Sequence, residues 1–232
     1  MSATEELSLE QAYAIQDALR AELARRGQRS IGWKVGATSA SGQTVMGVKE
    51  PASGFLLPAQ YVSGADVPLR EFTSPGVEAE VAFRVRARLA GPGVTAAAAA
   101  AAVEGALPAL ELPDFMFSGK PRVGDFVANS VIARAVVLGD SVTPLDGLDL
   151  AREEIVYEHN GDVVGRYTAA EVMGNPLNAL AWLANHLATR GLALMPGDLV
   201  MSGSISAVVR PKAGDTVRAS YTHLGAVSVR FP

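Results

Sequence analysis

The chain has 232 residues, of which 49% are hydrophobic and 19% charged, and its formal net charge is −4. This hydrophobic content can form the core of one large domain or two small ones, and it argues against intrinsic disorder. The small negative charge gives no electrostatic basis for binding nucleic acid or an anionic membrane. The absence of cysteine excludes disulfides, thiolate metal sites and cysteine nucleophiles, and it is consistent with a cytoplasmic protein.

The first predicted element is an amphipathic helix over residues 8–27. Apolar residues recur there at helical intervals, Ser8 and Gln11 have the spacing of a capping box, and Gly27 suits the C-terminal stop. From Ile31 onward, short apolar pieces broken by glycine predict strands and tight turns. No basic segment followed by an apolar run opens the chain, and no stretch approaches the roughly 20 apolar residues that span a bilayer. We therefore expect no signal peptide and no membrane partner.

The middle of the chain predicts further strands and one helix. Residues 77–89 alternate in the manner of a strand, with apolar side chains on one face. The alanine-rich stretch 94–107 predicts a helix. Two apolar strands are expected to follow it, over residues 109–112 and 127–138.

The last third predicts a hairpin, a helix and a strand-rich tail. The hairpin covers residues 155–167 and turns at Asn160-Gly161. The helix covers residues 176–190 and begins at a proline, which suits a first helical position. The tail consists of short strands joined by Pro-Gly-Asp and Ala-Gly-Asp turns.

Taken together, these elements predict the α+β class. A helical and short-strand N-terminal segment is expected over residues 1–70 and a mixed β-rich domain over residues 71–232. No long linker or internal repeat separates the two, so we expect one compact unit.

Three glutamates are the first candidates for chemistry. Glu78 and Glu80 stand two apart in a predicted strand, which places their carboxylates on one face about 7 Å apart. Two such charges raise each other's pKa unless a cation lies between them, although a solvated strand face is the ordinary alternative. Glu111 favours the metal hypothesis, because it stands in an apolar, proline-bounded strand where burying an unpaired carboxylate is costly. Three carboxylates without a Cys or His ligand suit a hard ion such as Mg²⁺ or Mn²⁺.

Seven segments in a fixed order resemble a known family. They are IGWKVGATS, MGVKEPASG, GVEAEVAF, LPALELPD, GNPLNALAWLANHL, PGDLVMSGS and the closing pair AGDTV and LGAVSVRF. The order is similar to that of the 2-keto-4-pentenoate hydratase and 4-oxalocrotonate decarboxylase group of the fumarylacetoacetate hydrolase superfamily, over nearly the whole chain. The resemblance implies a mixed β-roll and a divalent metal held by a Glu-x-Glu pair and a later Glu. The matching positions are Glu78, Glu80 and Glu111.

The resemblance also implies which residues contact substrate. Lys34 lies in a GxKxG segment where the family has a lysine that binds or polarises the substrate. A lone ammonium in this apolar run can by itself meet a carboxylate or an enolate, and an exposed strand-edge lysine is the alternative. Ser202, Gly203 and Ser204 match a small glycine turn near the substrate, where backbone N–H groups can approach an anion. An ordinary turn is the alternative for these three.

The segment GVKEP departs from the family pattern. An acidic residue usually follows the Gly-Val pair and is thought to move protons, but here that position is Lys49, with Glu50 next to it. Proton transfer to a dienol carbon needs a group of suitable pKa within reach. Glu50 is therefore predicted to be a substitute catalytic residue. The alternative is a surface turn that presents both charges to water.

The leading hypothesis is a metal-dependent lyase that acts on a small 2-oxo acid or its dienol. Its expected reaction is hydration of a 2-hydroxypenta-2,4-dienoate-type substrate in the breakdown of aromatic compounds. Decarboxylation of a 4-oxalocrotonate-type diacid and C–C hydrolysis of an acylpyruvate are the other enzymatic hypotheses. A non-catalytic partner subunit is the alternative of another class, and a cation such as Lys49 reaching into the glutamates would favour it. We further expect a cytoplasmic homo-oligomer, with an enzyme of the same pathway as a further partner.

Overall fold

The structure is a computed structural model that describes residues 6–119 and 121–232. Its strands are β1 (Gly32–Gly36), β2 (Ala52–Leu56), β3 (Gln60–Val62), β4 (Ala65–Asp66), β5 (Glu78–Val85), β6 (Val103–Pro113), β7 (Ala133–Leu138), β8 (Glu154–His159), β9 (Asp162–Thr168), β10 (Leu199–Ser204), β11 (Thr216–Tyr221) and β12 (Gly225–Arg230). Its helices are α1 (Leu9–Arg25), α2 (Ala40–Met46), α3 (Ala96–Ala101), α4 (Val123–Ala128) and α5 (Pro176–Thr189), with 3₁₀ turns η1 (Leu69–Glu71), η2 (Ser130–Ile132), η3 (Leu150–Arg152) and η4 (Ala169–Glu171). The expected α+β class is confirmed.

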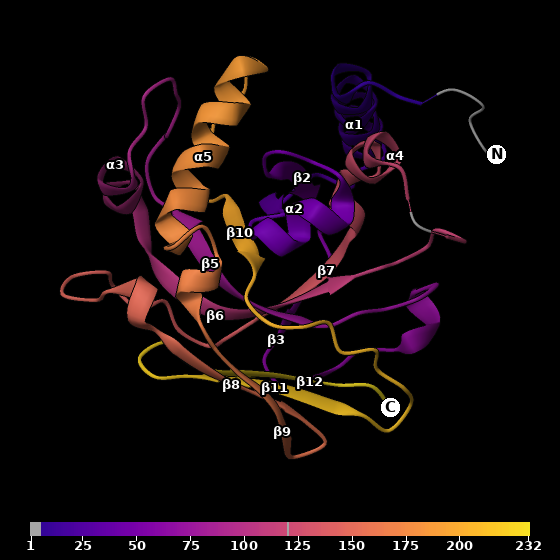
Figure 1. Cartoon of the computed structure of the whole chain (residues 1–232), viewed down its shortest axis with the longest axis vertical. Helices are drawn as coiled ribbons and strands as arrows, with labels where there is room; N and C mark the ends of the chain where they lie inside the picture. The colour runs from indigo at the N-terminus through magenta and orange to yellow at the C-terminus, as the bar shows by residue number, and fades with distance from the viewer. Residues whose placement is uncertain (1–5, 120) are drawn as a thin grey trace.

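Two sheets organise the molecule. A seven-stranded sheet has the order β2-β1-β10-β5-β6-β7-β3, and a five-stranded sheet has the order β4-β12-β11-β8-β9. The five-stranded sheet lies below the larger one in Figure 1, where β11 and β12 contact β6, while α1, α3, α4 and α5 gather above it. The larger sheet is therefore the layer around which the other elements are arranged.

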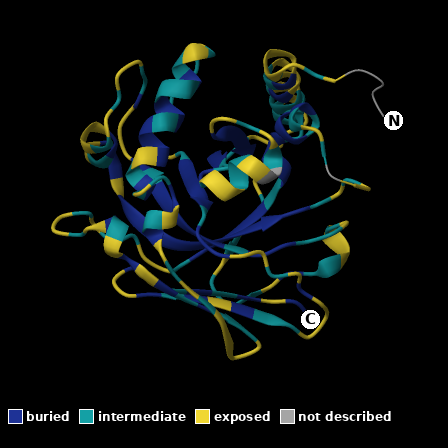
Figure 2. Ribbon diagram, viewed as in Figure 1, coloured by how far each residue is buried: buried dark blue, intermediate teal, exposed yellow. Residues whose placement is uncertain are grey.

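The seven-stranded sheet curls so that its two ends approach each other, because β2 near one edge contacts β7 near the other. The inner face of this curl has an apolar cluster of its own, formed by Leu56, Ala82, Leu107, Ala109, Val136, Leu138, Leu199 and Met201. The outer face belongs to the larger core, which includes residues of α3, α5 and the five-stranded sheet. Figure 2 shows the central strands as almost entirely buried. The mixed β-roll implied by the resemblance is confirmed.

Both long helices begin and end where the sequence indicates. The Ser8 side chain accepts from the Gln11 backbone N–H at 3.2 Å, and the Gln11 side chain accepts from the Ser8 N–H at 2.9 Å, which completes the capping box. The second helix, α5, begins at Pro176 behind an Asn175 cap. The predicted hairpin is formed by β8 and β9, and its turn lies at Asn160-Gly161.

Two predicted elements were wrong in extent. The helix expected over residues 94–107 ends at Ala101, and Val103 already belongs to β6. An alanine helix buries little surface, whereas pairing residues 103–107 with β5 satisfies their backbone groups and buries Val103 and Leu107. The strand expected over residues 127–138 begins only at Ala133, because Val127 and Ala128 end α4 and η2 follows.

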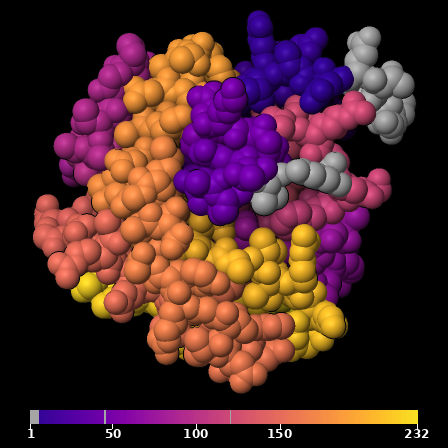
Figure 3. Space-filling view, viewed as in Figure 1, coloured from indigo at the N-terminus to yellow at the C-terminus, as the bar shows by residue number. Residues whose placement is uncertain are grey.

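Strands from both expected segments share one sheet. From the first 70 residues come β1, β2 and β3, and β1 pairs in parallel with β10 from near the C-terminus. The division at residue 70 stays a prediction, although Figure 3 shows the two segments packed against each other. None of the described helices is long and apolar enough to cross a membrane.

Candidate metal centre

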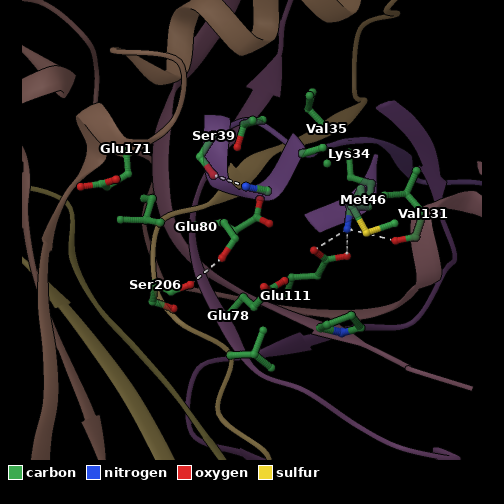
Figure 4. Close-up of a pocket in the computed structure, with 18 of the residues that line it drawn as sticks. Lys34, Val35, Ser39, Met46, Glu78, Glu80, Glu111, Val131, Glu171 and Ser206 are labelled. Atoms are coloured by element: carbon green, nitrogen blue, oxygen red, sulfur yellow. Dashed lines mark hydrogen bonds and ion pairs between the residues drawn. The ribbon is translucent and has the colours of Figure 1, made fainter. Parts of the chain in front are cut away.

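Three carboxylates converge on the inner face of the curled sheet (Figure 4). Glu78 and Glu80 project from β5, and Glu111 projects from β6, where it stands directly opposite Glu78 in the strand register. One carboxylate oxygen from each residue lies within 4.8 Å of those of the other two. The two-residue alternation predicted from the sequence thus supplies two of the groups, and the pairing of β5 with β6 supplies the third.

A buried ammonium completes this group. Lys34 on β1 is 4% exposed, and its Nζ donates to Oε1 and Oε2 of Glu111 at 2.5 and 2.6 Å. The same Nζ lies 3.3 Å from the carbonyl oxygen of Val131. Lys34 therefore neutralises Glu111, while neither Glu78 nor Glu80 forms an ion pair with a cation among the described residues.

Burial and mutual repulsion make the free carboxylates difficult to ionise. Burial, followed by the charge of Glu111, raises the pKa of Glu78 to about 7 and the pKa of Glu80 well above its usual range. Burial alone would lower the pKa of Lys34, but the charges of Glu111, Glu80 and Glu78 outweigh it and raise that pKa. The charge of Lys34 lowers the pKa of both Glu78 and Glu80, but it does not outweigh their burial and the charge of Glu111.

These residues fit a divalent cation. Oε2 of Glu80 accepts from the Gly203 N–H at 2.8 Å, while its Oε1 is buried without a hydrogen-bond partner among the described residues. Three carboxylates and one ammonium leave two negative charges, which one divalent ion balances. An all-oxygen ligand set is the type that Mg²⁺ and Mn²⁺ prefer. Lys49 is exposed and does not line this site, so it does not take the place of a metal.

The carboxylates form the inner wall of a cavity of about 600 Å³. The loop after β1 contributes Thr38 and Ser39 to its lining, and the segment after β10 contributes Ser206. Tyr167 and Glu171, from the end of β9 and the 3₁₀ turn η4, also line it. A small molecule that enters this cavity meets the glutamates and Lys34 at its inner end.

The residues Ser202, Gly203 and Ser204 do not form the expected glycine turn. They end strand β10, where the register with β5 shifts between Met201 and Ser204. This irregularity and the positive φ of Gly203, 122°, let its N–H point at Glu80, and a Cβ there would lie 2.5 Å from Oγ1 of Thr38. Ser204 lines the cavity, whereas Ser202 is fully buried and does not.

Comparison with known protein families shows to which family this chain belongs. The model described as fumarylacetoacetate (FAA) hydrolase C-terminal matches residues 34–231. The chain belongs to the FAA hydrolase family. The resemblance drawn from the seven segments is confirmed.

Comparison with individual proteins shows which members of the FAA hydrolase family this chain is similar to. It is 36% identical to 4-oxalocrotonate decarboxylase of Pseudomonas putida over 97% of the chain and 86% of the relative. It is 34% identical to 2-hydroxyhexa-2,4-dienoate hydratase of Comamonas testosteroni over 97% of the chain and 87% of the relative. Its fold matches the 4-oxalocrotonate decarboxylase of Pseudomonas putida G7 solved with magnesium and adipate, with a TM-score of 0.94, 33% identity and coverage of 98% and 87%. The chain is thus a member of a group of metal-dependent hydratases and decarboxylases.

A strained segment, residues 130–132, lies beside the site of this family member and was not predicted from the sequence. Ser130, Val131 and Ile132 all have positive φ values, between 52° and 55°, which is costly for residues with side chains. The Ser130 hydroxyl holds the segment in place, because it accepts from the Phe55 N–H at 2.7 Å and donates to the Phe55 carbonyl at 2.8 Å. Gly54 leaves room for it, since a Cβ there would lie 2.3 Å from the Ser130 carbonyl oxygen. The strain presents the Val131 carbonyl to Lys34, and no local sequence pattern signals it.

The structure places Glu50, the predicted substitute for the missing acidic residue, away from the three glutamates. Glu50 is exposed between α2 and β2, and it lines a separate hollow beside the start of α1. The cavity with the three glutamates does not include it.

We therefore expect Glu50→Gln to behave like wild type. A surface substitution of this kind changes stability by no more than about 0.5 kcal/mol, and we expect kcat and KM to stay within about twofold. Steady-state kinetics across pH 5 to 9 would check this, with Glu80→Gln as the inactive reference. Loss of the acidic limb of the pH–rate profile in Glu50→Gln would return Glu50 to the site.

Proposed function

We propose that this protein is a metal-dependent lyase that acts on a small 2-oxo acid or its dienol. The reaction we assign is addition of water to a 2-hydroxypenta-2,4-dienoate-type substrate in the breakdown of aromatic compounds. The observation that carries the proposal is the set of three inward carboxylates beside a buried ammonium, with an unpartnered oxygen on Glu80. Several of its relatives are hydratases of such dienoates, which supports this reaction.

The metal ligands in this proposal are Glu78, Glu80 and Glu111. When bound, the ion supplies a Lewis acid that withdraws charge from the 2-oxo group and so favours the dienolate form of the substrate. The Gly203 N–H fixes the orientation of Glu80 by holding its second oxygen. That contact is comparable to the outer hydrogen bonds that orient metal ligands in other sites.

Lys34 is assigned to the anionic head of the substrate. Its ammonium is held in one position by both oxygens of Glu111 and by the Val131 carbonyl, so it stays charged at the inner end of the cavity. A fixed positive charge in a water-poor site stabilises developing negative charge without reorganisation. Ser204 is assigned to substrate contact, because it lines the same cavity. Substrate contact by Ser202 and Gly203 stays a prediction, because Ser202 does not line the cavity and the Gly203 N–H is held by Glu80.

Decarboxylation is the second candidate. The 36% identity to a 4-oxalocrotonate decarboxylase favours it, and the same withdrawal of charge at the 2-oxo group would drive the loss of CO₂ from a vinylogous diacid. Hydrolysis of an acylpyruvate is the remaining enzymatic alternative, and it needs a base positioned for water. A partner subunit without activity is disfavoured by the complete set of carboxylates.

Turnover of a substrate panel tests the proposal. We expect hydration of 2-hydroxypenta-2,4-dienoate with Mg²⁺ or Mn²⁺, followed as loss of the dienoate absorbance. A chelator should abolish the reaction, and added Mg²⁺ should restore it. The proposal fails if no dienoate, oxalocrotonate-type diacid or acylpyruvate is turned over with either metal, or if turnover survives metal removal.

We also propose a cytoplasmic homo-oligomer that works beside an enzyme of the same pathway. This part of the proposal has its basis in the family resemblance and in the small-acid chemistry of the site. Light scattering of the purified protein would give its oligomeric state. Cell fractionation would give its location, and co-purification from cells grown on an aromatic carbon source would reveal a partner enzyme.

A further inference from the structure

The charged residues at the inner end of the cavity can accommodate one anionic head group. Its single ammonium, on Lys34, is already shared between Glu111 and the Val131 carbonyl. A 2-oxo acid bound there has its carboxylate beside Lys34 and the three metal ligands. Any further group on the substrate must therefore lie against the outer walls of the cavity.

The outer walls are mostly apolar. The apolar side chains that line the cavity around its mouth and sides are Met46, Phe115, Phe126, Ile132, Ile205 and Val208. Such surfaces stabilise hydrocarbon by removing it from water, and they give a charged group nothing in return for its lost hydration.

Apart from Glu171, the described polar side chains on these walls are hydroxyls, which carry no charge. The Ser39 hydroxyl accepts from the Gly42 N–H at 3.1 Å, and the Tyr167 hydroxyl accepts from the Ala207 N–H at 3.2 Å. Ser206 accepts from the Ala79 N–H at 2.9 Å. These groups can donate a hydrogen bond to a neutral polar atom, but none can neutralise a carboxylate.

The part of the chain that the structure describes places no second cation in the lining of the cavity. Among the described residues that line the cavity, Lys34 is the only Lys, Arg or His. Arg210 does not line the cavity: its guanidinium stacks on the ring of Phe115, 3.6 Å from the centroid, and donates to the backbone carbonyl of Ser74, although its charge helps to lower the pKa of Glu78. Apart from Lys34 and the three glutamates, Glu171 is the one charged residue among the described lining residues, and it is exposed at the end of η4.

We infer that the substrate has a single carboxylate and an uncharged, mainly hydrocarbon tail, and that a second terminal carboxylate is rejected. The inference deepens the proposed function, on which it rests, by choosing the monoacid dienoates over diacids of the oxalocrotonate type. A tail carboxylate would lose hydration against apolar walls and would face Glu171, whose charge repels it. A methyl or methylene group at the same place gains from the same walls.

Binding of a matched pair of saturated acids tests the inference without turnover. The pair is 2-oxohexanoate and 2-oxohexanedioate, which differ only by a methyl or a carboxylate at the last carbon. We expect calorimetry of the wild-type protein with Mg²⁺ to show at least about tenfold tighter binding of the monoacid. The kcat/KM values for 2-hydroxyhexa-2,4-dienoate and 4-oxalocrotonate should differ in the same direction.

The variant Glu171→Lys tests the role of the charge at the mouth. Because Glu171 is exposed and screened by solvent, we expect the preference for the monoacid to fall by only about two- to fivefold. Glu154→Lys, an equal charge change at an exposed position on β8 and in another hollow, should leave the preference unchanged.

The outcomes separate the inference from the proposed function. Equal or tighter binding of 2-oxohexanedioate by the wild-type protein overturns the inference while leaving a metal-dependent lyase intact. Selective binding of 2-oxohexanoate without turnover of any dienoate supports the inference and overturns the proposed reaction. Binding of neither acid in the presence of Mg²⁺ overturns both.

Discussion

Replacing Glu80 by glutamine is expected to remove metal binding and activity together. The carboxylate is 1% exposed, one of its oxygens is unpartnered, and the other is fixed by the Gly203 N–H. The amide has nearly the same shape but lacks the negative charge, so the ion loses a charged ligand in a site that water enters poorly. Changes in the outer shell of metal sites already cost about 10- to 100-fold in affinity, and loss of a ligand charge should cost at least as much.

Titration with Mn²⁺, followed by the paramagnetic signal of the free ion, would measure this loss beside kcat/KM. Glu104→Gln is the matched control, because Glu104 lies on the neighbouring strand β6 with a side chain 47% exposed and only a loose ion pair to Arg84. We expect it to bind metal like wild type. Wild-type Mn²⁺ affinity in Glu80→Gln would refute the metal centre.

Replacing Lys34 by methionine is expected to impair turnover while metal binding is retained. Methionine fills the space of the lysine stem but cannot present a charge to the substrate head group. Removal of one fixed donor to a developing oxyanion costs about 10²- to 10³-fold in rate, and we expect kcat/KM to fall by that order. The three carboxylates remain, so the divalent ion should still bind.

The same variant should be less stable without metal than with it. Lys34 and Glu111 form a buried ion pair, and removal of one partner from such a pair typically costs about 3 to 5 kcal/mol. Added Mg²⁺ should recover part of this loss, because it supplies positive charge to the same carboxylates. Thermal unfolding with EDTA and with Mg²⁺ would show the difference, and Lys212→Met, at an exposed turn, is the control. Unaltered kinetics in Lys34→Met would rule out its contact with substrate.

The sequence by itself determined those features that depend on neighbours along the chain. The capping box of α1 needs only Ser8 and Gln11, three residues apart. The placement of Glu78 and Glu80 on one face needs only the two-residue period of a strand. The order of seven short segments was enough to indicate the family, and the three glutamates that it matched converge in the structure.

The local sequence pattern did not show where α3 ends. Alanine has a high helix propensity, but an alanine helix is readily displaced by strand pairing. Residues 103–107 joined β6 because β5 was there to receive their backbone hydrogen bonds and to bury Val103 and Leu107. A partner strand about 20 residues away in the chain outweighed the intrinsic preference of the stretch. The extent of the helix was therefore a tertiary outcome.

Only the tertiary structure decided which candidates meet. Glu111 stands opposite Glu78 through the register of β5 with β6, and Lys34 reaches them because β1 pairs with β10, which pairs with β5. The curl of the same sheet leaves Glu50 outside the cavity and gathers apolar side chains around the glutamates. Strand register and sheet curvature arise from contacts between residues far apart in the chain, and these contacts leave no local period in the sequence.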